Sequence, residues 1–246
     1  MPCHYKLNFG FVKQEMSYVV LAFCRLIFSD SGLCQWSMVC RPGGDIRSLA
    51  YDGNTLVGVG SKRGMIYTTD SGESWANVEA GFNVNYCTFF KVCFFKELSL
   101  VGTSSGGIRF SKSGYSYLWG QKPTSGADDI LAFADSRGKA SVKFLAGGFG
   151  GGVRVSSDSG KSWMSSNNGL VNMNITSHAS GQTPQDSTGQ IILAGTYGDG
   201  LYASTDNGQN WMPKNQSLSA LQINAMEVAG GLLYMGTHQG IIRSCD

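Results

Sequence analysis

Four aspartates are the clearest candidates for catalysis in this sequence: Asp45, Asp128, Asp129 and Asp199. Two carboxyl groups that face a sugar several ångströms apart can hydrolyse its glycosidic bond. Either Asp128 or Asp129 could form such a pair with Asp199 or Asp45. The chemistry that these residues could perform is therefore glycoside hydrolysis, provided that the fold brings two of them together.

Other catalytic and cofactor-binding patterns are missing from the sequence. The histidines are His4, His178 and His238, and none belongs to a Ser–His–Asp or Cys–His pattern. The seven cysteines are scattered without a CxxC pair, so we expect free thiols in a reducing compartment rather than a disulfide framework or a zinc site. The glycine run 147–152 precedes a strand, not a phosphate-binding helix. We therefore expect no metal and no cofactor.

The composition is that of a folded domain with many tight turns. Hydrophobic residues make up 42% of the chain and charged residues only 15%, so there is enough apolar material for a core. The 34 glycines suggest turns between short strands. The formal net charge of +2 indicates no nucleic-acid partner. No segment approaches the ~20 apolar residues needed to span a bilayer.

An eight-residue motif, Ser/Thr-x-Asp-x-Gly-x-x-Trp, recurs along the chain. Intact copies occupy 68–75, 156–163 and 204–211, degenerate copies begin at 28 and 110, and the first residues of a sixth copy are Ser244 to Asp246. The aspartate slots are residues 30, 70, 112, 158, 206 and 246, so the repeat recurs about every forty residues. This period is typical of propeller blades or solenoid units.

The motif aspartates are predicted to build turns rather than to catalyse. A carboxylate can accept hydrogen bonds from unpaired backbone N–H groups of a turn, and a glycine two places later can adopt positive φ. Lys112 stands in one aspartate slot, which suggests that the carboxylate can be lost from a turn. The residues assigned to this structural role are Asp30, Asp70, Asp158, Asp206 and Asp246, with Trp75, Trp163 and Trp211 filling the gaps between blades.

The motif resembles the Asp box, or bacterial neuraminidase repeat, and the resemblance covers nearly the whole chain. It implies a β-propeller, the fold of sialidases, xyloglucanases, sortilin-type receptors and photosystem II assembly factors. We expect an all-β fold: one six-bladed β-propeller domain of four-stranded antiparallel blades. The expected blades are 7–40, 44–80, 84–122, 128–168, 172–216, and 220–246 together with 1–6. The strands expected in the second are Ile46–Tyr51, Thr55–Gly60, Met65–Thr69 and Ser74–Val78.

The N-terminus is predicted to close the ring. The last repeat offers only three strands, whereas residues 1–6 precede the first repeat and have no place in it. Met1-Pro2 also matches Met212-Pro213, which follows the motif in the fifth repeat. Residues 1–6 would then form the outer strand of the last blade and remove an exposed sheet edge.

Ligand contacts are expected on the face opposite the motif turns, where the resemblance places ligands. Loops between second and third strands and loops between blades would meet there. The candidates are Arg25, Arg41, Asp45, Lys62, Arg63, Tyr86, Asp128, Asp129, Phe149, Tyr197, Asp199 and His238. Four residues near the starts of inner strands are expected to cap turns: Asn85, Asp129, Asn174 and Asn224.

Enzymatic activity has weaker support than binding. A sialidase is expected to hold its substrate with three arginines and to carry an Arg-Ile-Pro type motif before its first box, but Arg41-Pro42 lacks the middle residue and follows the first box. We expect a monomeric, non-catalytic scaffold that binds a protein, peptide or glycan. The alternative is a glycan-active protein, either a lectin or a glycoside hydrolase of the sialidase or xyloglucanase type.

Overall fold

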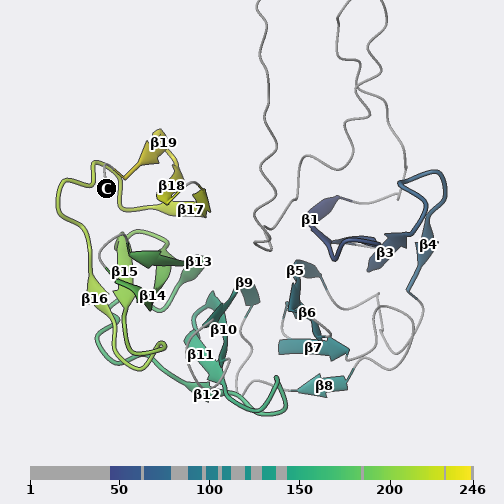
Figure 1. The fold of residues 1–246 in the computed structure, drawn as a ribbon, viewed down its shortest axis with the longest axis horizontal. Coiled ribbons are helices and arrows are strands. Elements are labelled where there is room, and N and C mark those ends of the chain that lie inside the picture. The colour runs from purple at the N-terminus through teal and green to yellow at the C-terminus, as the bar shows by residue number, and fades with distance from the viewer. Residues whose placement is uncertain are drawn as a thin grey trace, which may run out of the picture.

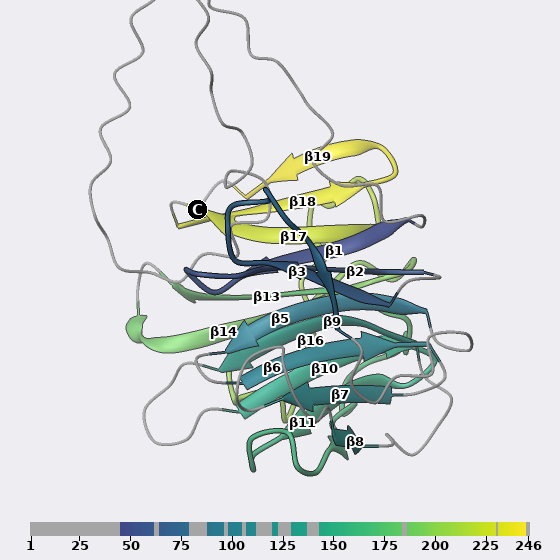
Figure 2. The same ribbon diagram turned by 90° about the vertical axis from the view of Figure 1, so that its right-hand side faces the viewer.

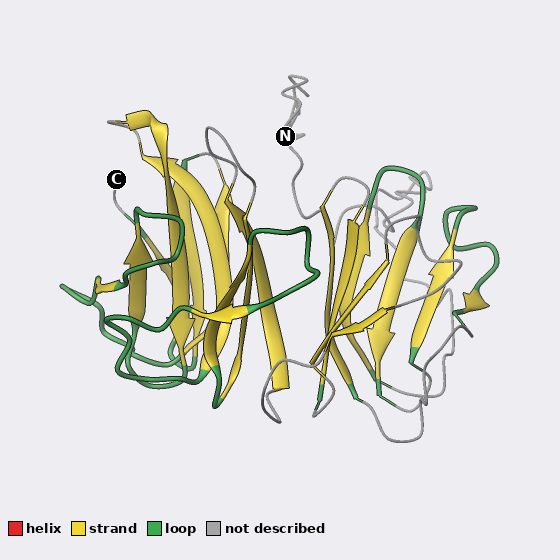
Figure 3. Cartoon of the chain, turned by 90° about the horizontal axis from the view of Figure 1, so that it is seen from below, coloured by secondary structure: helices red, strands yellow, loops and turns green. Residues whose placement is uncertain are grey.

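The chain is an all-β propeller. The computed structural model describes residues 45–61, 64–78, 88–95, 98–104, 107–111, 120–122, 129–136, 143–183, 186–229 and 231–244. These ranges contain strands and loops but no helix, and so no helix that is long and apolar enough to cross a membrane (Figure 3). Their strands form five antiparallel sheets, each hydrogen-bonded in chain order. The sheets stand as blades around a common centre, with β1, β5, β9, β13 and β17 innermost (Figure 1).

The blades have the following strands. The first described blade contains β1 (Ile46–Tyr51), β2 (Leu56–Gly60), β3 (Met65–Thr68) and β4 (Ala76–Asn77). The second contains β5 (Phe89–Phe95), β6 (Leu98–Thr103), β7 (Gly107–Ser111) and β8 (Gly120–Lys122). The third contains β9 (Asp129–Ser136), β10 (Lys143–Phe149), β11 (Gly152–Ser156) and β12 (Met164–Ser165). The fourth contains β13 (Ile175–Thr183), β14 (Asp186–Thr196), β15 (Leu201–Ser204) and β16 (Met212–Pro213). The last contains β17 (Ile223–Ala229), β18 (Leu232–Thr237) and β19 (Gly240–Arg243).

The expectation of six four-stranded blades is not met by the described residues. They form five blades, of which the β17–β19 blade has three strands. The segments 7–40 and 1–6, which were expected to form the other blade and the closing strand, lie outside the described residues. Where strands were expected in detail, β1 has the expected bounds, whereas β4 keeps only two residues of the segment Ser74–Val78.

Burial follows the position of each strand within its blade. β2 and β6, the second strands of the first two described blades, are buried at every position. The outer strands β4 and β12 are exposed. Seen from the side, the strands of successive blades lie across the molecule in similar directions and their turns emerge at its two ends (Figure 2). One of these ends carries the motif turns, and the other carries the candidate site.

Glycines in the second strands let the next blade approach closely. A Cβ atom on Gly102 of β6 would collide with the backbone of Ile130 and would lie 2.8 Å from its Cγ2 atom. Ile130, in the inner strand β9 of the following blade, is itself fully buried. The same contact joins Gly147 to Ile175 and Gly195 to Ile223. An isoleucine packed on a glycine is therefore the recurring inter-blade contact of this propeller.

The motif turn is closed by its own side chains, as the turn around Asp206 illustrates. Asn210 donates from its backbone N to Asp206 Oδ1 (2.9 Å) and from Nδ2 to Oδ2 (2.6 Å). Ser204 Oγ donates to Asp206 Oδ1 (2.8 Å) and accepts from the Gly208 N–H (2.9 Å). Asn207 has φ of 61° and Gly208 has φ of 82°, so two successive residues take the left-handed conformation. The turns at Asp70 and Asp158 have the same bonds.

These hydrogen bonds keep the motif carboxylates ionised. The Ser162 hydroxyl and backbone N–H, which both donate to Asp158, lower the pKa of its carboxyl to about 2. Burial raises the pKa of Asp206, but the donors from Asn210 and Ser204 outweigh it and lower the pKa overall. Such carboxylates have no proton to give at neutral pH and their oxygens are already engaged, which suits a structural role. Asp30 and Asp246 lie outside the described residues.

Two of the motif tryptophans, Trp163 and Trp211, contact the preceding blade. Trp211 is 3% exposed, packs in one cluster with Leu145 and Val153, and donates from Nε1 to the carbonyl of Ser166 (2.9 Å). Trp163 is half-buried and packs against the cluster that contains Leu100 of the blade before it. Trp75 is half-buried as well. The indole of one repeat thus fills space between its own blade and the previous one.

Cys93 is a free thiol in β5, and burial raises its pKa. The other cysteines lie outside the described residues.

Candidate functional site

The candidate site lies at the end of the blades opposite the motif turns, which we call the loop face. It is formed by turns between second and third strands and by loops that enter the inner strands. Of the residues predicted for it, the structure describes Asp45, Asp129, Phe149, Tyr197, Asp199 and His238. Arg25, Arg41, Lys62, Arg63, Tyr86 and Asp128 lie outside the described residues.

One loop holds two neighbouring turns of the loop face in place. Asn174, directly before β13, accepts from the Gly150 N–H with Oδ1 (3.0 Å) and from the Tyr197 N–H with its backbone carbonyl (2.9 Å). Asn172 donates from Nδ2 to the carbonyl of Tyr197 (3.2 Å). The turns after β10 and β14 are therefore fixed to each other through 172–174. Asn174 caps a turn, as expected from its place in the sequence.

Phe149 and Tyr197 form an exposed aromatic pair on this frame. Their ring centroids are 5.6 Å apart and their planes meet at 58°, a favourable tilted arrangement. Phe149 is 42% exposed and Tyr197 is 49% exposed, so both rings present surface to solvent. Two large aromatic rings held open to water on a rigid frame are suited to stacking against a ligand.

Two exposed aliphatic residues lie in the loops that lead to this face. Val171 and Leu221, which the sequence reasoning did not select, are 82% and 43% exposed. Leu221 lies beside Gln222, which bridges to Tyr197 through backbone hydrogen bonds and donates from Nε2 to Asn224 Oδ1 (3.3 Å). Exposed aliphatic residues in glycine- and asparagine-rich loops leave no periodic signal, which explains why these two were missed.

Asp199 is engaged by its own blade. Tyr202, which is 2% exposed, donates its hydroxyl to Asp199 Oδ2. The Asp199 N–H bonds to Thr196 Oγ1 (3.0 Å), and Asn215 Nδ2 donates to the Asp199 carbonyl (3.0 Å). Burial, together with this carboxylate, raises the pKa of Tyr202. Asp199 therefore orders the turn beside Tyr197.

Asp45 is engaged as well, in the β1–β4 blade. Arg47 Nε lies 2.7 Å from Asp45 Oδ2, and Ser61 Oγ donates to Oδ1. The hydrogen bond from Arg47 is the main cause that lowers the pKa of Asp45. The Arg47 guanidinium also lies over the Phe90 ring, 5.1 Å from its centroid. This carboxylate is held in a local ion pair.

The two remaining described candidates stand apart from this ion pair. Asp129 is the first residue of β9, half-buried, and its backbone is in register with Phe149 of β10. His238 is exposed in the turn between β18 and β19. The structure thus brings Phe149, Tyr197, Asp199 and Asp129 to adjacent elements of the β9–β12 and β13–β16 blades. Asp45 lies in a blade separated from these by the β5–β8 blade.

Comparison with known proteins supports the fold. No family model and no curated protein matches the sequence. Among solved structures, the chain is similar to the extracellular domain of the putative hybrid two component system BT3049 from B. thetaiotaomicron, with 17% identity, a TM-score of 0.61, and coverage of 82% of this chain and 27% of that one. It is similar to an ancestral GH74 enzyme at 20% identity and a TM-score of 0.59, over 78% of this chain and 27% of the enzyme.

A third similar structure is YCF48 bound to D1 peptide, with 16% identity and a TM-score of 0.58 over 82% of this chain and 64% of YCF48. These proteins have propeller folds. The chain has the β-propeller fold too. It spans only about a quarter of the length of the first two structures, and at these identities the likeness concerns the fold alone.

Proposed function

We propose that this chain is a non-catalytic binding propeller of the Asp-box type, with its ligand on the loop face across Phe149 and Tyr197. The observation that carries the proposal is the pair of exposed rings, 5.6 Å apart, on the frame made by Asn172 and Asn174. Aromatic surface bordered by amides suits an extended ligand, such as a peptide segment or a glycan. YCF48, a propeller of similar fold, was solved with a peptide.

The carboxylates support binding over hydrolysis. A glycosidase needs one carboxyl group that donates a proton and a second that acts as base or nucleophile. Asp199 is bonded by Tyr202, and Asp45 is bonded by Arg47 and Ser61. Asp129 is half-buried at the start of β9, and Asp128 lies outside the described residues. Glycoside hydrolysis stays the alternative, and clear turnover of a fluorogenic glycoside that Asp129→Asn abolishes would establish it.

Replacing Tyr197 tests the proposed site. Glycan and peptide arrays probed in parallel identify the ligand class, and Tyr197→Ala is expected to weaken binding of the best ligand about tenfold or more, because a central aromatic contact is lost. Met164→Ala is the matched control, since Met164 is 69% exposed on the outer strand β12. Equal binding by the two variants would place the ligand elsewhere.

We also propose that the ring has six four-stranded blades, with a blade at 7–40 and residues 1–6 beside β19. The described β17–β19 blade has three strands, with β19 at its edge. Deleting 1–6 is expected to lower the melting temperature by several degrees, because a sheet edge and its apolar contacts become exposed. A melting temperature equal to that of the full chain would contradict this closure.

A further inference from the structure

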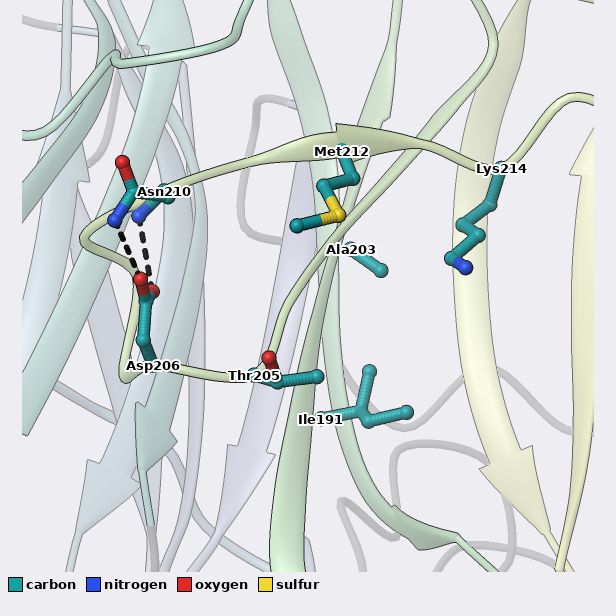
Figure 4. Close-up of a pocket in the computed structure, with 7 residues that line it drawn as sticks. All are labelled: Ile191, Ala203, Thr205, Asp206, Asn210, Met212 and Lys214. Carbon is teal, nitrogen blue, oxygen red and sulfur yellow. Dashed lines mark hydrogen bonds between the residues drawn. The ribbon is translucent and has the colours of Figure 1, made fainter.

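The segment that follows the motif in the β13–β16 blade crosses the blade from the motif turn to the loop face. It begins at Asn210, which bonds to Asp206 through its backbone N–H and its side chain, and it runs through Met212 to Lys214 (Figure 4). Asn215 is the next residue, and its amide group meets the turn between β14 and β15. One short segment thus contacts both ends of the blade.

Asn215 bonds to this turn with both polar atoms of its amide. Its Nδ2 donates to the carbonyl of Asp199 (3.0 Å), and its Oδ1 accepts from the Leu201 N–H (2.8 Å). An adjacent antiparallel strand would pair these two backbone groups, but the two-residue strand β16 pairs only with the residues that follow them. The amide of Asn215 therefore extends the outer edge of the sheet to the turn that carries Tyr197.

Asn167 makes the same pair of hydrogen bonds in the β9–β12 blade. Its Nδ2 donates to the carbonyl of Gly151 (3.3 Å), and its Oδ1 accepts from the Val153 N–H (2.7 Å). The fit is close, since a Cβ atom on Gly152 would lie 2.4 Å from Asn167 Oδ1. Two successive blades therefore hold their loop-face turns in one way, and we call Asn167 and Asn215 the clasp asparagines.

The clasp asparagines stand four residues behind the motif tryptophan, and the other repeats have different residues at that place. Counted from the tryptophan or tyrosine of their motifs, those repeats carry Cys40, Glu79 and Gln121. One short side chain that serves a C=O and an N–H at once needs a donor and an acceptor, which asparagine supplies. The two repeats that have it are those whose loop-face turns carry Phe149 and Tyr197. The clasp and the exposed ring thus occur in the same blades.

We infer that Asn167 and Asn215 are positioning residues of the loop-face site, each holding the turn that presents one of the two rings. The inference rests on the proposed function, in which Phe149 and Tyr197 contact the ligand. The loop 172–174 holds these turns beside the inner strand β13, and the clasp asparagines hold them from the side of the outer strands β12 and β16. Rings that are fixed from two sides lose little conformational freedom on binding, which favours affinity.

The contact between the two rings is the readout, because it needs no ligand. Nuclear Overhauser effects between the ring protons of Phe149 and Tyr197 are measured in the full chain with labelled phenylalanine and tyrosine. We expect them in the parent chain, whose ring centroids are 5.6 Å apart, and we expect their loss in Asn167→Ala and in Asn215→Ala. Asn168→Ala is the matched control and should keep them, since the exposed Asn168 amide donates to the following motif and not to a loop-face turn.

Amide exchange shows that the clasp is lost in a variant that still folds. The Leu201 N–H is expected to exchange at least about tenfold faster in Asn215→Ala, because its acceptor is gone. Asn215→Asp is a second variant of nearly the same shape, which sets an oxygen against the Asp199 carbonyl and should also separate the rings. Ring contacts that persist in these variants overturn the inference. Unchanged ligand binding by Tyr197→Ala would instead refute the loop-face ligand, so the two failures are distinguishable.

Discussion

Gly102→Ala is expected to lower the free energy of unfolding by about 3 kcal/mol, because the added methyl group has no space between two blades. The new Cβ atom would collide with the backbone carbonyl of Ile130 and lie 2.8 Å from Ile130 Cγ2. Ile130 is fully buried in the inner strand β9, so neither its backbone nor its side chain can move without shifting the next blade. Urea unfolding followed by tryptophan fluorescence measures the loss.

Gly236→Ala is the matched control for this prediction. Gly236 stands at the same place in β18, but its nearest neighbour for a Cβ atom is Ala225 Cβ at 3.7 Å, an ordinary contact. We expect a change within about 0.5 kcal/mol, since the methyl group makes only ordinary contacts among the described residues and alanine also reduces the entropy of the unfolded chain. A loss at Gly236 equal to that at Gly102 would mean that the glycines serve the strands themselves and not the contact between blades.

The repeat in the sequence predicts this architecture because its residues act locally. The serine, aspartate and glycine of each motif close a turn within eight residues, so their roles follow from their spacing, as the turn at Asp206 illustrates. The glycines of the second strands are equally regular in the sequence. Their partners are not local, because the contact of Gly102 with Ile130 depends on how two blades pack.

The candidate site was only partly predictable for the same reason. Phe149 and Tyr197 could be assigned to the loop face from their place between strands, but their mutual contact depends on the loop 172–174 that joins two blades. Asp199 was predicted as a site residue because it is a carboxylate in a loop between strands. Its bond to Tyr202 turns it into a structural residue, and a side chain three residues away gives no sign of that bond in the sequence.

His178 is an ionisable residue that packs between two blades. It lies in β13, 9% exposed, with its ring stacked on Trp211 at 6.3 Å between centroids and 13° between planes. Neither ring nitrogen has a hydrogen-bond partner among the described residues. Burial lowers its pKa from 6.5 to about 3. The folded protein therefore holds this imidazole neutral, between two blades, at neutral and mildly acidic pH.

This burial makes stability depend on pH in a defined direction. The unfolded chain takes up a proton on His178 below pH 6.5, whereas the folded chain does so only near pH 3. The contribution of His178 to the free energy of unfolding is therefore fully present above pH 6.5. Below pH 6.5 the free energy of unfolding falls by about 1.4 kcal/mol per pH unit. We expect the free energy of unfolding to be about 2 kcal/mol lower at pH 5 than at pH 7.5 from this residue. Burial raises the pKa of Glu227, which works in the opposite direction, so the effect must be isolated by comparison.

His178→Leu removes the proton uptake and keeps an apolar side chain of similar size between the blades. The variant is expected to lose the difference of about 2 kcal/mol in the free energy of unfolding between pH 5 and pH 7.5. This holds whatever its absolute stability, because protonation of His178 changes how that free energy depends on pH. Denaturant unfolding at a series of pH values measures it. His238→Leu, in the exposed β18–β19 turn, is the control and should keep the slope of the parent chain. A parent slope that survives His178→Leu would show that the buried imidazole is not what ties stability to pH, and that the inter-blade space around Trp211 admits water or a counter-charge when the ring is protonated.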